Sequence, residues 1–254
     1  MAQIDLNSDL GESFGPWNMG NDNTMLGIVS SANIACGGHA SDPETMFNTI
    51  RLAVANGVSI GAHPGFDDKA GFGRRLIPMS ASEVERLVAS QVGALTGIAN
   101  LTGATVNYVK AHGALANWAA ATPAVANAVA AAVKRAAPGC ALLAISGTEL
   151  ESAGIKHGLK TYSEVFADRT YQSTGQLTPR SIDGAVIHDA NHACERLVNF
   201  LQTGKMPTIE GGTVELKAES ICIHGDNPAA VTMAQTIRKQ LMANGFTIAP
   251  FIAD

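Results

Sequence analysis

The sequence predicts a (β/α) barrel, a parallel sheet closed on itself with its helices outside, and three observations support this prediction. Strand-like and helix-like segments alternate about seven times, which is typical of parallel sheets covered by helices. Polar residues follow strand-like runs all along the chain, whereas an open sheet would collect them near one switch point. No repeat, charge block or low-complexity linker divides the sequence, so we expect one domain over residues 1–254.

The elements of the first half are marked by caps and by apolar periodicity. Asp42-Pro43 supplies an N-cap and a first-turn proline to one helix, which Asn56-Gly57 ends. Ser80 and Glu83 form a capping-box pattern that begins another. A glycine-rich loop over 11–22 is long enough to fold over a site. The predicted strands are 3–8, 31–36 and 58–63, and a short helix is expected at 22–30.

The second half continues the same alternation. The alanine-rich segment 114–137 is helical rather than a linker, with a cap at Thr122-Pro123 and a stop at Pro138-Gly139. A short helix begins at Thr148. Further helices are predicted at 190–203 and 228–244, strands at 105–110, 141–145, 160–166 and 219–224, and short extra strands at 213–217 and 246–250.

Composition excludes several classes of function. Hydrophobic residues make up 46% of the chain and charged residues 15%, so a sizeable core is available. The net charge of −5 and the lack of a basic run argue against a nucleic-acid surface. No signal-peptide pattern and no 18-residue apolar run occur, so we expect a cytoplasmic protein with no membrane contact. Four cysteines without C-x-x-C spacing indicate buried free thiols, among which Cys36 is a weak candidate nucleophile.

Four of the seven histidines stand directly after strand-like apolar runs. A lone histidine there is more often structural, but the C-terminal ends of parallel strands share one face, so four indicate one polar site. The candidate catalytic residues are Asp9, Glu12, His39, His63, Lys110, His112, Asp168 and His224. Such a set could perform acid–base chemistry on an amide or hold a divalent metal that activates water, and both options remain open.

Arginines in two loops are candidates for binding an anionic substrate. Arg74 and Arg75 follow a glycine-rich loop, and paired guanidinium groups suit a carboxylate or phosphate. A polar loop after the sixth barrel strand carries further charges, although a solvated loop with a surface ion pair is the alternative. The substrate-binding candidates are Asn7, Arg74, Arg75, Arg169, Tyr171 and Arg180.

Common catalytic signatures are missing. The sequence contains no G-x-x-x-x-G-K-[ST] phosphate loop, no G-x-S-x-G elbow and no H-E-x-x-H helix. Gly71-Phe-Gly73 is only half of a dinucleotide fingerprint. P-loop, α/β-hydrolase and metalloprotease chemistry are therefore not indicated.

The ordered motifs resemble the LamB/YcsF family from about residue 3 to 250. They are Asp5-Leu-Asn-Ser-Asp-Leu-Gly-Glu12, Cys36-Gly-Gly-His39, Gly61-Ala-His-Pro-Gly65, Gly71-Phe-Gly-Arg-Arg75, Lys110-Ala-His-Gly-Ala-Leu115, Asp168-Arg-Thr-Tyr171 with Pro179-Arg180, and His224-Gly-Asp-Asn227. The resemblance implies an irregular seven-stranded barrel related to sugar deacetylases. It also implies cleavage of the lactam 5-oxo-L-proline to L-glutamate with ATP hydrolysis, together with subunits B and C of 5-oxoprolinase.

The resemblance leaves the pocket shape and the division of labour open. Gly38, Phe66, Ala111 and Ala116 depart from the aromatic, tyrosine, proline and tyrosine expected there. An arginine is expected to grip the substrate carboxylate or the phosphate, while Asp9, Glu12 or a histidine activates water. The alternatives are a metal-dependent amidohydrolase or deacetylase that needs no ATP, and a subunit that binds a lactam without catalysis.

Overall fold

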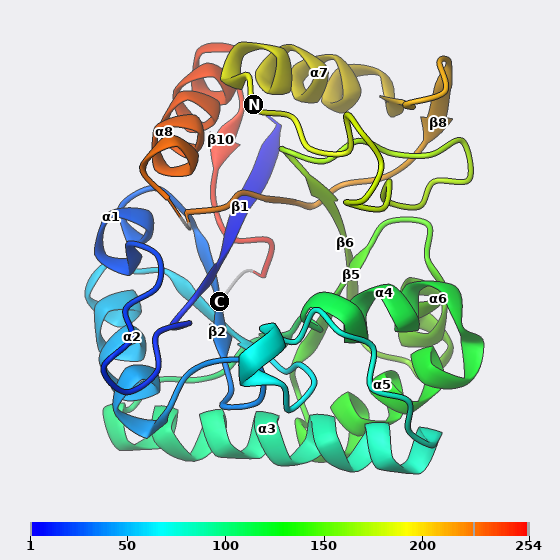
Figure 1. Ribbon diagram of the computed structural model, residues 1–254. Coiled ribbons are helices and arrows are strands. Elements are labelled where there is room, and N and C mark those ends of the chain that lie inside the picture. Colours follow the sequence, from blue (N-terminus) through cyan, green and yellow to red (C-terminus); the bar gives the residue numbers. More distant parts are fainter. Residues whose placement is uncertain (1, 226, 253–254) are drawn as a thin grey trace.

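The computed structural model describes residues 2–225 and 227–252, and its centre is a closed barrel of parallel strands (Figure 1). The seven barrel strands are β1 (Gln3–Leu10), β2 (Ser31–Ala35), β3 (Ser59–His63), β4 (Tyr108–Val109), β5 (Ala141–Ile145), β6 (Thr161–Phe166) and β9 (Ser220–Cys222). They pair in chain order, and β9 closes the barrel by pairing with both β6 and β1. The predicted fold class and the strand number implied by the family are confirmed.

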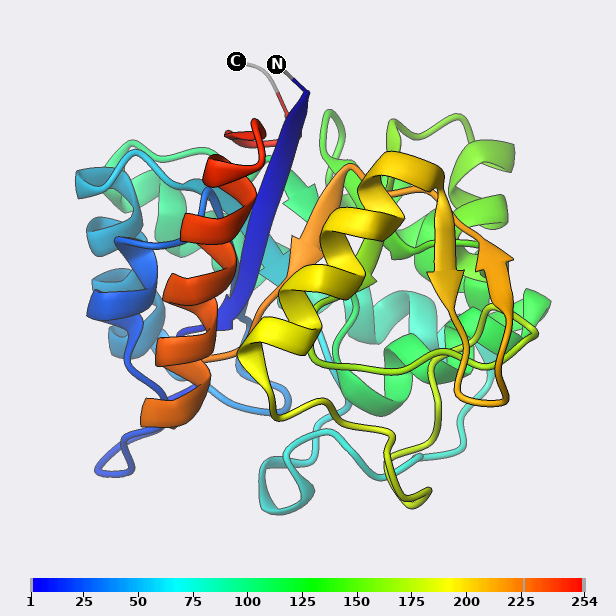
Figure 2. The ribbon, with the colours of Figure 1, turned by 90° about the horizontal axis from the view of Figure 1, so that it is seen from above.

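The helices cover the outside of the barrel. They are α1 (Asp22–Leu26), α2 (Pro43–Ala55), α3 (Ala81–Thr102), α4 (Gly113–Ala121), α5 (Pro123–Ala136), α6 (Glu149–Lys156), α7 (Ala190–Thr203) and α8 (Pro228–Ala243), with a 3-10 turn η1 (Lys69–Gly71). The predicted caps form as expected: Asp42 caps α2, and Ser80 and Glu83 make the capping box of α3. Figure 1 and Figure 2 show α7 (yellow) packed next to α8 (orange to red) on the outside of the barrel.

Three short strands make the barrel irregular. β7 (Lys205–Pro207) and β8 (Thr213–Glu215) form an antiparallel pair outside the barrel. The sequence predicted a strand at 213–217 but not its partner, because a three-residue strand before a turn has no periodicity to detect. β10 (Thr247–Ile248) extends the sheet by pairing with the start of β1.

The helix start predicted at Thr122-Pro123 is confirmed: Thr122 precedes a proline, takes the extended conformation and separates α4 from α5, so segment 114–137 is helical on both sides of it. Other predicted boundaries were wrong. The strand predicted at 105–110 is regular only at 108–109, although the backbone N–H of Asn107 still bonds to Ile60 at 2.8 Å. α1 ends at Leu26 rather than 30, and β9 is shorter than 219–224.

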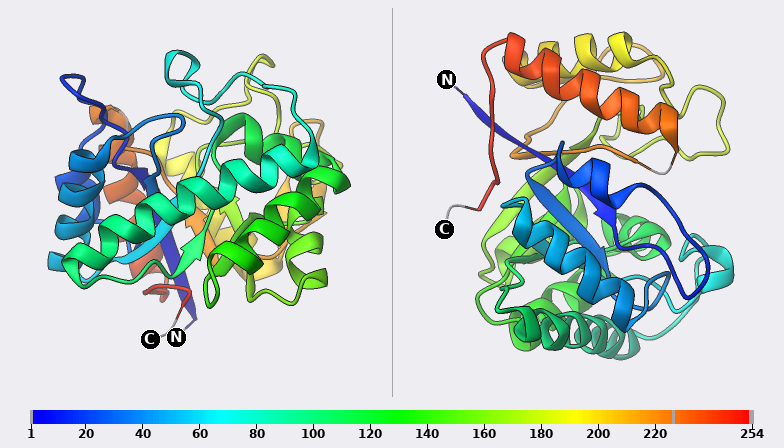
Figure 3. Two further views of the ribbon diagram at one scale, coloured as in Figure 1. Left: turned by 90° about the horizontal axis from the view of Figure 1, so that it is seen from below. Right: turned by 90° about the vertical axis from the view of Figure 1, so that its left-hand side faces the viewer.

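The loops after the C-terminal ends of the strands collect on one side of the barrel. The left panel of Figure 3 shows the loops after β1, β3 and β6 on the side opposite the start of β1 (dark blue). Any residue at a strand's C-terminal end therefore faces the same rim. Among the described residues, no helix has the length and apolar character needed to cross a membrane.

Candidate active site

The barrel interior is lined by polar side chains, because successive residues of β1 point alternately toward the interior and toward the hydrophobic core. Ile4, Leu6 and Leu10 belong to the hydrophobic core, while Asp5, Asn7 and Asp9 make hydrogen bonds across the barrel. Asn33 on β2 donates to Asn7 at 2.7 Å and to Asp9 at 2.9 Å. The column of polar side chains rises from the bottom of the barrel to the rim, where it ends at Asp9.

Asp5 begins that column at the bottom of the barrel. Its carboxylate accepts hydrogen bonds from Ser30 and Ser31, each at 2.7 Å, and from Ser220. Burial raises the pKa of Asp5 to about 6 against the opposing effect of these hydroxyls. The hydroxyls stabilise the charged form of this carboxylate, which forms no ion pair among the described residues, and these hydrogen bonds link β1 to β2 and β9.

Lys110 connects the column to the rim. Its buried ammonium lies 3.1 Å from Asp9, 2.8 Å from Glu164 and 3.2 Å from the amide oxygen of Asn7. Burial alone would lower the pKa of Lys110, but the carboxylates of Asp9 and Glu164 raise it well above its usual value. Lys110 is thus a charged structural and electrostatic partner of the carboxylates, and it is held away from solvent.

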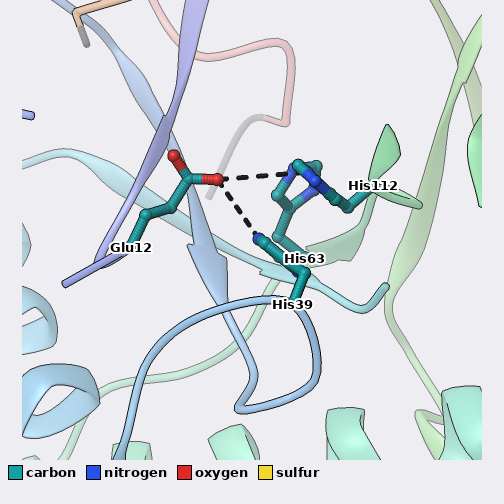
Figure 4. A group of neighbouring side chains, drawn as sticks. All are labelled: Glu12, His39, His63 and His112. Atoms are coloured by element: carbon teal, nitrogen blue, oxygen red, sulfur yellow. Dashed lines mark hydrogen bonds and ion pairs between the residues drawn. The ribbon is translucent and has the colours of Figure 1, made fainter. Parts of the chain in front are cut away.

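A cluster of three histidines and one carboxylate lies next to Asp9. Figure 4 shows His39, His63 and His112 turned toward one another, with Glu12 facing them. Glu12 Oε1 lies 3.2 Å from His39 Nε2 and 3.9 Å from His112 Nδ1. His112 Nδ1 lies 3.0 Å from His63 Nε2, and the rings of His39 and His112 stack with centroids 3.6 Å apart. We call these four residues the histidine–glutamate cluster.

Backbone carbonyls determine the tautomers of two of these rings. His63 Nδ1 lies 2.8 Å from the carbonyl oxygen of Lys110, and His112 Nε2 lies 2.9 Å from that of Phe72. A carbonyl only accepts, so both of these nitrogens carry hydrogen and donate it. When the rings are neutral, the other two nitrogens, His63 Nε2 and His112 Nδ1, therefore face each other with bare lone pairs.

Burial sets the charges of the cluster. It lowers the pKa of His39 well below the usual value and that of His112 to about 3, with help from the neighbouring imidazoles. Both rings are therefore neutral at pH 7. Burial, together with the charges of Asp9 and Asp22, raises the pKa of Glu12 well above its usual value.

Asp9 behaves in the opposite way from Glu12. Burial would raise its pKa, but His63 and Lys110 outweigh burial and hold it well below the usual value. Its second oxygen, Oδ2, lies 3.3 Å from His63 Nε2. Asp9 is the ionised carboxylate of the rim, and it is oriented by three neighbours.

A second acid–base pair stands on the other side of the rim. His224 Nδ1 lies 2.8 Å from Asp168 Oδ2, and the His224 side chain is 20% exposed. Burial would lower the pKa of His224, but Asp168 raises it overall, and burial of Asp168 is outweighed by His224, which lowers the pKa of that carboxyl. Each of the two groups therefore favours the charged form of the other. Asp226 of the same motif lies outside the described residues.

These groups border a cavity of about 800 Å³, a size typical of ligand pockets. Among the predicted residues, those that line it are Asp9, Glu12, His63, Arg74, Lys110, His112, Arg169, Arg180 and His224. Asn7, His39 and Asp168 do not line it, but each contacts a residue that does. Most of the predicted set is thus brought together.

Three predicted substrate contacts are placed otherwise. Arg75 does not line the cavity, because it forms an ion pair with Asp68 and its side chain is 66% exposed. Tyr171 is fully buried, and its hydroxyl accepts a hydrogen bond from the backbone of Phe166. Arg169 lines the cavity, but its guanidinium donates to the carbonyl oxygens of Thr178 and Ala185. In this arrangement all three side chains stabilise the loops that carry them.

Sequence reasoning missed Glu164 and Asn33 as members of the site. Both point into the barrel, Glu164 toward Lys110 and Asn33 toward Asp9. The signal was available in the two-residue period of β2 and β6, which puts them on the interior face with Ser31 and Tyr162. Cys36, in contrast, is buried and its burial raises the thiol pKa to about 12, which does not suit a nucleophile.

Comparison with known proteins places this geometry in a family. The model of the LamB/YcsF family matches residues 4–253. The chain belongs to the LamB/YcsF family. A relative from Nitrobacter hamburgensis, named as the A subunit of 5-oxoprolinase, is 49% identical over 249 residues, which cover 98% of each chain. A crystal structure titled lactam utilization protein, from Thermus thermophilus, is 40% identical, with a TM-score of 0.92 over 97% of this chain and 99% of that one.

A more distant neighbour shows the fold alone. The catalytic domain of a peptidoglycan N-acetylglucosamine deacetylase from Eubacterium rectale is 11% identical, with a TM-score of 0.51 over 97% of this chain and 87% of that chain. The two chains therefore share the barrel architecture.

The departures from the expected LamB/YcsF motifs have different surroundings. A Cβ atom at Gly38 would lie 2.6 Å from the amide of Gln91, which bonds to both backbone polar groups of Gly65. Gln91 thus fills the space that a side chain at position 38 would need. Phe66 is buried beside Trp118 and does not line the cavity, whereas Ala111 and Ala116 do. Only these two alanines alter the cavity wall.

Proposed function

We propose that this chain is the A subunit of an ATP-dependent 5-oxoprolinase and that its cavity is where the lactam of 5-oxo-L-proline is opened to L-glutamate. The observation that supports this most directly is the full-length identity of 49% to a relative named for that same component. The name of the Thermus thermophilus structure, a lactam utilization protein, agrees with the same substrate class.

The chemistry explains why ATP and other subunits belong to the proposal. An unstrained five-membered lactam is a poor electrophile, and its hydrolysis does not proceed far at neutral pH. Phosphorylation of the lactam oxygen makes the ring carbon open to attack by water. The C–N bond then breaks as the nitrogen takes up a proton, and a second water hydrolyses the resulting acyl phosphate to the carboxylate and phosphate. ATP and subunits B and C would supply the activated lactam, and this chain would open the ring.

The rim offers groups for each part of that ring opening. Asp9, ionised and 3.3 Å from His63, would accept a proton from the attacking water. The departing ring nitrogen needs a proton. His224, whose pKa is raised by Asp168, could donate it from its protonated ring. Arg74 and Arg180 line the cavity and form no ion pair within the described part of the chain, so both guanidinium groups are available for the substrate carboxylate or phosphate.

Glutamate release from 5-oxoproline tests the proposal, with and without ATP, for this chain alone and with its partner subunits. We expect ATP-dependent release only in the mixture. Asp9→Asn should reduce that release at least about 100-fold, because the variant cannot take up the proton. Asp67→Asn, an exposed carboxylate outside the cavity, is the matched control and should keep full activity.

Other outcomes would support the two alternatives. Release that needs no ATP and is abolished by a chelator would indicate a metal-dependent amidohydrolase, which the histidine–glutamate cluster favours. Tight binding of 5-oxoproline, with unchanged release from the complex after Asp9→Asn, would indicate a binding subunit without catalysis. No release under any condition would contradict the assignment to 5-oxoproline.

A further inference from the structure

We propose that the histidine–glutamate cluster, Glu12, His39, His63 and His112, is a binding site for one divalent transition-metal ion of the zinc class. This inference deepens the proposed function, because it adds an electrophile to the same cavity. It concerns the isolated chain, however, and can be tested without substrate, ATP or partner subunits.

The spacing of the donor atoms supports the site. One ligand atom from each of the four residues lies within 4.8 Å of the ligand atoms of all the others. The separations between neighbouring donors are 3.0 Å (His63 Nε2 to His112 Nδ1), 3.2 Å (Glu12 Oε1 to His39 Nε2) and 3.9 Å (Glu12 Oε1 to His112 Nδ1). Ligands at about 2.0–2.1 Å around a tetrahedral zinc lie about 3.3 Å apart. The donor atoms are therefore spaced as first-sphere ligands are.

The two facing lone pairs are the strongest observation. His63 and His112 each donate their N–H to a backbone carbonyl. When both rings are neutral, no hydrogen therefore lies between His63 Nε2 and His112 Nδ1. Two lone pairs at 3.0 Å repel unless a cation lies beside them. That cation is either a proton, which Asp9 at 3.3 Å from His63 would stabilise, or a metal ion.

The outer contacts are those that metal-binding histidines use. A ligating imidazole usually donates its other N–H to a carbonyl or carboxylate, which fixes the ring and the tautomer. The carbonyls of Lys110 and Phe72 do this for His63 and His112. The set of imidazoles and one carboxylate favours zinc over magnesium or calcium.

A second group of donors in the cavity is a poorer metal site. Asp9, Cys222 and His224 also bring ligand atoms within 4.8 Å of one another. The Lys110 ammonium lies 3.3 Å from Cys222 Sγ and 3.1 Å from Asp9, so a positive charge already occupies that position. Burial also raises the pKa of the Cys222 thiol well above its usual value, which keeps it protonated.

A metal ion bound at the cluster would polarise an oxygen of the substrate or lower the pKa of a bound water. Asp9 stands next to the cluster through its contact with His63, so it can take the proton that such a water releases. The cluster thus lies on the side of the cavity where attack on the ring carbon is proposed.

Metal binding is measured on the purified chain after chelator treatment and dialysis. Calorimetry with Zn²⁺ and the visible spectrum with Co²⁺ report stoichiometry and coordination, and elemental analysis reports retained metal. We expect one equivalent of metal per chain. The near-isosteric Glu12→Gln and the His112→Gln variants should bind at least about 100-fold more weakly. His192→Ala, an exposed histidine outside the cavity, and Cys222→Ser should bind as the wild type does.

The outcomes distinguish a bound metal ion from a proton between His63 and His112, and they do not depend on the proposed function. Less than about a tenth of an equivalent bound by the wild type would overturn the metal site and leave the proton between His63 and His112. Binding lost in Cys222→Ser but kept in Glu12→Gln would overturn it in favour of the second group. Because the wild-type Co²⁺ spectrum needs no variant to fold and no glutamate release, failure of the 5-oxoproline assay would leave this result unaffected.

Discussion

At the scale of single residues, most polar side chains of the site are held by partners rather than free to adapt. Lys110 contacts Asp9, Glu164 and Asn7, and Asp9 in turn is fixed by Asn33 and His63. Buried charges of this kind are stable only as a set, because each one would be costly to bury alone. The site is therefore preorganised by its own electrostatics.

Replacing Lys110, the central cation of this network, should show how strongly the buried charges depend on one another. Lys110→Met keeps the bulk of the side chain but leaves Asp9 and Glu164 without their shared counter-charge. We expect a loss of about 3–5 kcal/mol in the free energy of unfolding, measured by urea denaturation followed by circular dichroism. Lys160→Met, at an exposed position, should change it by less than about 0.5 kcal/mol. Equal stability of the two variants would refute the view that Lys110 is essential to the buried network.

The His224–Asp168 pair predicts a pH dependence of stability. Because the pKa of His224 is raised above its usual 6.5, its contribution is fully present below pH 6.5 and is lost as the pH rises through the raised value. His224→Gln should therefore cost about 1.5–3 kcal/mol near pH 6 and much less near pH 9. Urea titrations of the variant and the wild type at both pH values check this. A cost that stays constant with pH would mean that the pair is not ionic in the folded protein.

At the scale of elements, two glycines show how differently the same residue can be used. Gly97 lies on the exposed face of α3 with no atom near its missing Cβ, whereas a Cβ at Gly61 in β3 would overlap the ring of Tyr108. The Tyr108 hydroxyl donates to Asn33 at 2.7 Å, so that ring cannot move without breaking the polar column. Gly61 is thus required for the packing of β3 against β4.

Alanine substitutions should separate these roles. Gly97→Ala should stabilise the protein by about 0.5–1 kcal/mol, because alanine has the better helix propensity. Gly61→Ala should destabilise it by about 1–3 kcal/mol or more through overpacking against Tyr108. Thermal and urea unfolding of both variants measure the two effects. Similar shifts of the same sign would show that the ring of Tyr108 does not restrict position 61.

At the scale of the whole molecule, the barrel is closed by strands from the two ends of the sequence. β9 pairs with β1 and β6, and Ser220 on β9 bonds to Asp5 and Asn7 on β1. The site uses side chains from β1, β3 and β6 and from the segments that follow β1, β2, β3, β4, β6 and β9, so it is complete only when the barrel is closed. A single domain over residues 1–254 stays a prediction, which the unfolding of the chain can test.

One cooperative unfolding transition is therefore expected. Trp118 on α4 packs near Phe66, so its fluorescence reports on tertiary structure, while circular dichroism reports on all helices. In a Trp17→Phe background, which leaves Trp118 as the single indole, both signals should give the same urea midpoint. Midpoints that differ beyond error would indicate separately unfolding parts.

The sequence by itself determined the alternation of strands and helices, the caps of α2 and α3, and the meeting of strand-end side chains such as Asp9, His63 and His112. These features depend on local periodicity, on capping chemistry, and on the rule that parallel strands end on one face. Only the tertiary structure decided that Arg74 lines the cavity while Arg75 pairs with Asp68, that Tyr171 is buried, and that Glu164 meets Lys110. The same holds for the facing lone pairs of His63 and His112. These arrangements depend on loop paths and on distances between residues far apart in the chain, which no local pattern encodes.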